Sequence, residues 1–227
     1  MKPPNGLSER TCALLRKAAA ECLAYPDPDR LDARLALLRP ALAEVRGKAP
    51  GPVANLEVFL TWATDTPPLD RCAHYVETFD TRNRRSLYLT WWADGDTRRR
   101  GLSLVRLKQL YRAHGMTYAH EELPDFLPAV LEFAAVTGRP GDQLLQVHRV
   151  GLELLRLAVT EVSAPYAAVL EAVCATLPGP SPNTKEQARR LAAAGPPQEL
   201  VGIGAPPDAY GPAALPWPEP LSPEATG

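Results

Sequence analysis

The sequence predicts an all-α fold: a single helical bundle followed by a proline-rich, mostly irregular C-terminal tail. Three observations support this prediction. Apolar residues recur at intervals of three and four through the first 177 residues, as on the buried face of a helix. No stretch alternates between apolar and polar residues with hairpin signals at its ends. About half of the prolines follow residue 177, where they exclude a continuous helix or strand.

Two apolar stripes predict helices in the N-terminal third, over residues 12–23 and 31–45. Pro40 lies within the second stripe, so we expect a kink there, because proline removes a backbone donor from the helix. The prolines at positions 26, 28, 50, 52, 67 and 68 fall at helix starts and breaks.

Three more stripes predict helices in the second half of the body. The first covers residues 102–111 and ends at Gly115, and the second covers residues 144–155. The third begins after Ser163, which is expected to act as the N-cap, with Pro165 in the first turn. We therefore place an all-helical domain at residues 1–177. The tail at 178–227 contains one possible helix, over 183–194, with Thr184 as its cap.

Composition and charge exclude several classes of protein. The chain carries 25 basic and 26 acidic residues, a net charge of −1, which argues against a protein that coats nucleic acid. No apolar run approaches the roughly 20 residues that a membrane-spanning helix needs. The polar start at residues 1–10 has no apolar core of a secretory signal, and the four cysteines form no CxxC pair. The sequence therefore predicts a cytoplasmic protein without a disulfide framework or a zinc site.

Motifs for catalysis are absent or incomplete. There is no GxxxxGK[ST], HExxH or GxSxG pattern, and the pair Gly202 and Gly204 lacks the third glycine of a dinucleotide site. The turn Asp94-Gly95-Asp96 has Arg98 where a phosphatase loop has threonine. The four histidines are too dispersed to indicate a metal site. We therefore predict no catalytic residue, no metal ligand and no enzyme.

The most distinctive segment spans residues 75–112 and combines nine basic residues with six aromatic ones. Single-stranded nucleic acid binding is one interpretation. The other is structural: aromatic residues such as Tyr88 and Trp92 pack in the core and the arginines form a solvated face. Spacings of four residues predict ion pairs from Asp94 to Arg98 and from Asp96 to Arg100. The residues alone support a structural network and a binding surface about equally.

A second segment, residues 121–133, contains Asp125, which is expected to cap a helix with Pro128 in its first turn. One interpretation is simply a helix start with a polar lip. The other is an acidic patch of Glu121, Glu122 and Asp125 beside exposed apolar groups, suited to a basic amphipathic peptide. The residues alone leave both open.

These two segments, YVETFDTRNRRSLYLTWWADGDTRRRG and LPDFLPAVLEF, resemble the nitrate reductase molybdenum cofactor assembly chaperones, the NarJ-type or delta subunits. The resemblance covers roughly residues 8–177. It implies the helical fold of the redox-enzyme maturation chaperone superfamily. It also implies a cytoplasmic protein that binds the N-terminal segment of the catalytic alpha subunit of respiratory nitrate reductase. Such a chaperone assists insertion of the molybdopterin guanine dinucleotide cofactor, which it does not hold permanently, and delays membrane attachment.

The resemblance also implies a site. Related chaperones bind peptides near a motif E-P-x-D-H, and the corresponding stretch here is Leu123-Pro124-Asp125-Phe126, with phenylalanine where histidine is common. The expected groove lies between helices at 65–80 and 124–136. Its implied residues are Tyr75, Glu77, Phe79, Glu122, Leu123, Pro124, Asp125 and Leu127, and the implied hinge or shaping loop is Asp94, Gly95, Asp96 and Arg98.

Two alternatives remain beside this function. One is a sister chaperone for another molybdoenzyme. The other is a nucleic-acid-binding regulatory protein that uses the arginines from Arg82 to Arg100. The near-neutral chain, with acidic residues among those arginines, disfavours the second alternative, so we expect no nucleic-acid partner.

Overall fold

The computed structural model describes residues 6–118 and 122–194 of the chain. Within these ranges it contains helices and no strand, so the all-α prediction is confirmed. In chain order the elements are α1 (Glu9–Leu23), α2 (Leu31–Val45), α3 (Pro50–Asp65), α4 (Pro68–Tyr75), the π-helical turn η1 (Val76–Asp80), the 3₁₀ turn η2 (Asn83–Arg85), α5 (Leu89–Asp94), α6 (Arg98–Ala113), α7 (Leu127–Thr137), α8 (Arg139–Val147), α9 (Arg149–Thr160), α10 (Ala164–Ala175) and α11 (Lys185–Ala194).

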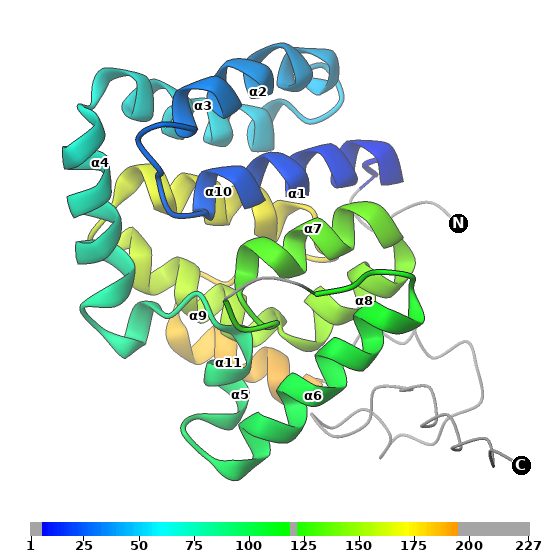
Figure 1. Ribbon diagram of the computed structural model, residues 1–227. Helices are drawn as coiled ribbons and strands as arrows, with labels where there is room; N and C mark the ends of the chain where they lie inside the picture. Colours follow the sequence, from blue (N-terminus) through cyan, green and yellow to red (C-terminus); the bar gives the residue numbers. More distant parts are fainter. Residues whose placement is uncertain (1–5, 119–121, 195–227) are drawn as a thin grey trace, which may run out of the picture.

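The helices are arranged in layers around α1 and α10 (Figure 1). α2 and α3 lie above this pair in the figure, α7 and α9 lie below it, and α5, α6 and α11 form the bottom edge. α10 packs against α3 on one side and α9 on the other, while α1 packs against α7. Because α10 is covered on several sides, it buries residues around most of its circumference, including Tyr166, Val169 and Leu170.

Helix ends follow the chemistry of their flanking residues. The Ser163 hydroxyl accepts a hydrogen bond from the backbone N–H of Tyr166 at 3.4 Å, which confirms the predicted N-cap of α10. α6 ends before Gly115, whose φ of +72° lies in the left-handed region that favours glycine. Between α7 and α8, Gly138 has a φ of +62° and turns the chain for the same reason.

The single helix predicted over residues 144–155 is wrong, because α8 and α9 are separate helices that meet at His148. The break lets α8 pack against α7 while α9 packs against α10. α9 approaches α5 closely at Gly151, where an added Cβ would lie 2.7 Å from the Cβ of Trp92. Apolar spacing continues across the break because both helices turn a face to the core, so the sequence does not reveal the change of axis.

The packed body extends past residue 177. Arg149 donates hydrogen bonds to the carbonyls of Gly179 and Pro180, both at 3.1 Å, and Ser181 donates to Glu153 at 2.8 Å. α11 follows and lies along α9. The predicted helix at 183–194 is confirmed, with its Thr184 cap, which accepts from the N–H of Gln187 at 3.2 Å. The contacts with the body thus continue after residue 177, through residues 179–181 and into α11.

The remaining tail, 195–227, lies outside the described residues, and with it the Gly202–Gly204 pair. Among the helices at 6–118 and 122–194, none combines the length and the apolar character that crossing a bilayer requires.

Candidate functional site

The two segments that stand out in the sequence lie side by side in the fold. The N–H of Leu127 donates to the carbonyl of Leu87 at 2.8 Å, and the N–H of Leu89 donates to the carbonyl of Asp125 at 3.0 Å. Tyr88 and Phe126 therefore form an isolated antiparallel bridge between these segments. Leu87, Leu89 and Leu127 are buried in the core, which fixes the register of the pair.

Asp125 is fully buried and organises the start of α5. Its Oδ2 atom accepts hydrogen bonds from the backbone N–H of Thr90 at 3.1 Å and from the Thr90 hydroxyl at 2.5 Å. The prediction that Asp125 caps its own helix is therefore wrong. α7 begins after Phe126 without a side-chain cap, and Asp125 instead caps a helix that precedes it by 35 residues. Its Oδ1 atom has no hydrogen-bond partner among the described residues.

Arg100 connects α6 to this arrangement. Its guanidinium lies 3.7 Å from Asp125 Oδ2, donates to the Thr90 hydroxyl at 3.2 Å, and faces the ring of Tyr88 at 5.7 Å. The predicted ion pairs within residues 94–100 do not form in the described structure. Asp94 instead accepts a hydrogen bond from Ser103 at 2.6 Å. The reason is that the buried Asp125 carboxylate offers Arg100 a less solvated partner than Asp96 does.

A polar and partly apolar surface lies above the buried pairing. The Tyr88 hydroxyl donates to Glu122 Oε2 at 2.5 Å, and the rings of Tyr88 and Phe126 lie 5.6 Å apart. Burial and the nearby Glu122 carboxylate raise the pKa of Tyr88, so the phenol remains a donor at neutral pH. Leu123 is 39% exposed beside them, and its carbonyl accepts from Tyr118 at 2.8 Å.

The chain around η1 supplies the other side of this surface. Tyr75 is buried, with its ring 5.4 Å from the half-exposed ring of Tyr25 and 5.0 Å from Phe79. The exposed residue Asp80 ends the π-helical turn, an element that often occurs at functional sites. Partial burial and then the Glu122 charge raise the pKa of Asp80, which shows that these two carboxylates are electrostatic neighbours.

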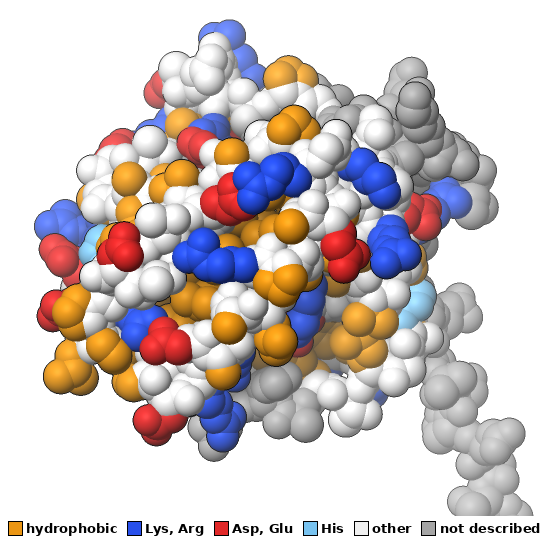
Figure 2. All heavy atoms as spheres, turned by 90° about the horizontal axis from the view of Figure 1, so that it is seen from above, with side chains coloured by type: hydrophobic (Ala, Val, Ile, Leu, Met, Phe, Trp, Pro, Cys, Tyr) orange, Lys and Arg blue, Asp and Glu red, His pale blue; other side chains and the backbone are white. Residues whose placement is uncertain are grey.

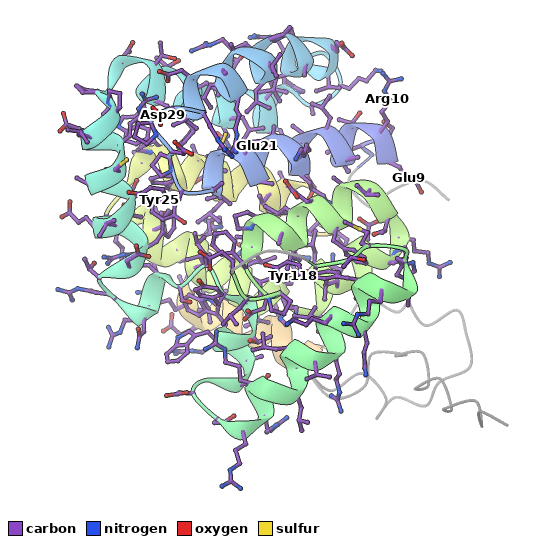
Figure 3. All side chains as sticks on the ribbon, in the orientation of Figure 1. Glu9, Arg10, Glu21, Tyr25, Asp29 and Tyr118 are labelled. Atoms are coloured by element: carbon purple, nitrogen blue, oxygen red, sulfur yellow. The ribbon has the colours of Figure 1, made fainter. Side chains whose placement is uncertain are left out.

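We call this region the aromatic–acidic surface, and it consists of Tyr25, Asp80, Tyr88, Glu122, Leu123 and Phe126. Figure 3 shows Tyr25 beside α4 and Tyr118 below α7. By contrast, the face over α2 and α3 in Figure 2 has small apolar areas separated by side chains of both charges. The aromatic–acidic surface joins aromatic rings to a pair of carboxylates instead.

The structure divides the predicted groove residues into two groups. Glu77, Glu122 and Leu123 reach the surface. Five others are buried and support the surface from below: Tyr75, Phe79, Pro124, Asp125 and Leu127. Glu121, which the sequence placed in the same acidic patch, lies outside the described residues.

Sequence reasoning missed Tyr25 and Asp80 as members of this surface. Tyr25 follows the first helical stripe and Asp80 lies within the segment 75–112, but only folding brings Asp80 near Glu122 and Tyr25 near Asp80. The expected shaping loop connects α5 to α6 through Gly95, which has a φ of +61°. Arg98 is exposed in the first turn of α6, away from the buried pairing. A hinge function of this loop stays a prediction.

No metal site is present among the described residues, since no group of three His, Cys, Asp or Glu side chains converges. Burial raises the pKa of the Cys22 and Cys174 thiols, which keeps both protonated. His74 shares a hydrogen bond of 2.8 Å with the Ser163 hydroxyl and stacks on Tyr166, so its contacts are those of a residue that packs between helices. An open hollow of about 620 Å³, lined by Arg156, Glu171 and Cys174, holds none of the predicted site residues.

Comparisons with known proteins agree on one family. The family model of the nitrate reductase delta subunit matches residues 43–172. The nitrate reductase-like protein NarX of Mycobacterium tuberculosis is 47% identical over 110 residues, 48% of this chain and 17% of NarX. The probable nitrate reductase molybdenum cofactor assembly chaperone NarJ of Bacillus subtilis is 45% identical over 62 residues, 27% of this chain and 34% of that relative.

A further relative is matched over a longer stretch. The probable nitrate reductase molybdenum cofactor assembly chaperone NarW of Escherichia coli is 34% identical over 137 residues, 59% of this chain and 56% of NarW. The chain thus spans between 17% and 56% of the length of these relatives. The family match, 43–172, contains the whole pairing of residues 87–89 with 125–127.

Proposed function

Because this chain belongs to the nitrate reductase delta subunit family, we propose that it is an assembly chaperone for a molybdenum-containing nitrate reductase. Relatives named as molybdenum cofactor assembly chaperones support this proposal. The chaperone binds the apo catalytic subunit in the cytoplasm and assists insertion of the molybdopterin guanine dinucleotide cofactor. It carries out no reaction of its own and holds no cofactor permanently.

The contact that we propose is between the aromatic–acidic surface and the N-terminal segment of the catalytic alpha subunit. The observation that carries it is the Tyr88–Glu122 hydrogen bond, which holds a carboxylate beside exposed apolar groups. Asp80 adds a second negative charge nearby. A basic amphipathic helix fits this pattern, because its cations can face the two carboxylates while its apolar side rests on Tyr25 and Leu123.

The buried layer below gives this surface a fixed shape. Asp125 ties the start of α5 to the chain before α7, and Arg100 adds α6 to the same point. The backbone of residues 122–127 is therefore held from beneath and does not have to be ordered when a peptide binds. Preorganisation of this kind improves affinity because less conformational entropy is lost on association. Helix-in-groove contacts commonly reach dissociation constants from nanomolar to micromolar, about −12 to −8 kcal/mol.

Isothermal titration calorimetry with a synthetic peptide of the client's N-terminal segment tests the proposal. We expect Glu122→Gln and Leu123→Glu each to weaken binding by about tenfold or more, equivalent to about 1.4 kcal/mol. Glu44→Gln on α2 and Val136→Glu on α7 are matched controls, because both residues are exposed and lie outside the aromatic–acidic surface. Wild-type affinity in both site variants would remove this surface from the proposed function.

A separate measurement tests the client. The full chain, mixed with the apo catalytic subunit, should form a complex that co-elutes on size exclusion and dissociates after cofactor is supplied. A complex that forms equally well with the cofactor-loaded subunit contradicts an assembly function. The same experiment with the catalytic subunit of a different molybdoenzyme distinguishes the sister-chaperone alternative.

A further inference from the structure

The outer face of α6 carries many positive charges and no negative ones. The helix contains six basic residues and no acidic residue. Arg100 turns inward to Asp125, but the other five form no ion pair with any side chain in the described ranges: Arg98, Arg99, Arg106, Lys108 and Arg112. Arg98 and Arg99 occupy the first turn, where the positive end of the helix dipole disfavours cations. Five cations are thus held on one helix without partners within the described chain.

The exposed face of α6 also has a regular pattern. Its central stripe is Arg98, Leu102, Val105, Gln109 and Arg112, with alternating intervals of four and three residues. This is the spacing of the seam through which two helices pack together. Leu102 is 62% exposed and Val105 is 55% exposed, whereas Leu107 and Tyr111 on the opposite face are buried. The stripe extends about 21 Å, with apolar groups at its centre and a cation at each end.

We propose that this outer face of α6 is a docking surface for an acidic amphipathic helix of a partner protein. Two aliphatic side chains at the centre match an apolar seam, and the flanking guanidinium groups pair with carboxylates in the bidentate geometry that arginine favours. Four of the five unpaired cations are arginines, a residue enriched in protein interfaces, where lysine is depleted.

Other partners fit this face less well. Single-stranded nucleic acid is usually held by aromatic stacking, and the one aromatic residue of α6, Tyr111, is buried against Phe133. A helix that lies in a membrane interface has a broad apolar side with anchoring aromatic residues, while α6 exposes only Leu102 and Val105 as large apolar groups. The aromatic–acidic surface has the opposite charge and selects a basic peptide, so α6 constitutes a second and independent contact.

The test uses fluorescence anisotropy with the full chain and a synthetic helix of three heptads, with leucine at its seam and glutamate at the flanking positions. We expect saturable binding that weakens at least tenfold in Leu102→Glu. The double variant Arg98→Glu with Arg112→Glu should no longer bind the acidic peptide. It should instead bind a peptide with the same seam and lysine at the flanking positions. Leu37→Glu, a matched change at a residue that is 73% exposed on α2, should bind like the wild type.

Four results would overturn the proposal. The first is an equal response of Leu102→Glu and Leu37→Glu, and the second is no saturable binding of the acidic peptide. The third is peptide binding only in a chain that ends at Ala194, which would assign this face to the chain's own residues 195–227. The fourth is tight binding to vesicles of phosphatidylglycerol without binding to the peptide, which would assign α6 to a lipid surface. Circular dichroism of each variant establishes that a loss does not come from unfolding.

Discussion

The Asp125 carboxylate caps α5 by accepting hydrogen bonds from both the N–H and the hydroxyl of Thr90, at 3.1 and 2.5 Å. This contact joins two segments that the chain separates by 35 residues. Because both residues are fully buried, no water replaces the bonds if one partner is removed.

Asp125→Ala should therefore lower the free energy of unfolding by about 1–3 kcal/mol, the cost of leaving buried donors unpaired. Urea unfolding followed by circular dichroism measures this. Asp96→Ala is the matched control, since Asp96 is exposed and its side chain forms no hydrogen bond or ion pair within the described residues, and it should change stability by less than about 0.5 kcal/mol. Equal effects of the two changes would contradict the capping role.

The approach of α8 to α7 leaves no space for a side chain at Gly141. A Cβ atom there would lie 2.1 Å from the Cα of Ala134. Gly141→Ala should force the helices apart and destabilise the fold by about 1–3 kcal/mol. Gly101→Ala on α6 meets nothing within 4 Å and should stabilise the fold by about 0.5–1 kcal/mol, because alanine favours the helix. Thermal unfolding of both variants tests whether the two substitutions change stability in opposite directions.

Binding of a basic client peptide should depend on pH through Asp80. The pKa of this carboxyl is raised by partial burial and by Glu122, so it takes up a proton at a higher pH than an ordinary aspartate. Protonation removes a charge that attracts the peptide. Affinity should therefore be highest at neutral pH and begin to fall, as pH decreases, above the usual aspartate range. Calorimetry across this range should show a weaker dependence in Asp80→Asn. If Asp80→Asn shows the same dependence of affinity on pH as the wild type, Asp80 is not the group whose protonation weakens peptide binding.

Glu153 holds the segment after α10 on the body. It is fully buried, with Oε2 2.8 Å from Arg156 Nε, and Oε1 accepts from Ser181 at 2.8 Å. Glu153→Ala leaves the buried guanidinium groups of Arg149, 3.8 Å away, and Arg156 without their carboxylate and should cost about 3–5 kcal/mol.

Hydrogen exchange should locate part of this loss in residues 178–194, because Arg149 and Arg156 also bind the carbonyls of residues 178–180 and 182. Glu161→Ala is the control, since its pair with Lys185 is solvent-exposed and contributes little to stability. Unchanged protection of residues 178–194 in Glu153→Ala would show that the Glu153 carboxylate does not anchor them.

Local chemistry made some features of the fold predictable. Ser163 and Thr184 cap the helices that follow them, because a hydroxyl that precedes a helix can accept a hydrogen bond from a free backbone N–H of the first turn. Asp125 shows the limit of this reasoning. It precedes a helix, as a cap does, yet its carboxylate binds Thr90 of α5 and lies near Arg100 of α6. These partners are distant in the chain, so a rule based on neighbouring residues cannot identify them.

The candidate site illustrates the same limit. The sequence identified Glu122 and Leu123 as surface groups, but it placed Leu127 in the groove, whereas the structure buries Leu127 completely. The sequence did not indicate Tyr25 as a site residue, because its partner Tyr75 is 50 residues away along the chain. Contacts of this kind depend on how helices are stacked, and periodicity reports only which face of each helix is apolar.

The amino-acid sequence by itself determined that this protein is helical, where several of its helices lie, and which family it resembles. These properties depend on neighbours a few residues apart, so they can be read from the chain. Only the tertiary structure decided which carboxylates meet, that the segment after residue 177 packs on α9, and that α6 turns Arg100 inward but its other cations away from the core. Those outcomes depend on the packing of segments distant in the chain, which follows from the shapes of the whole set of side chains.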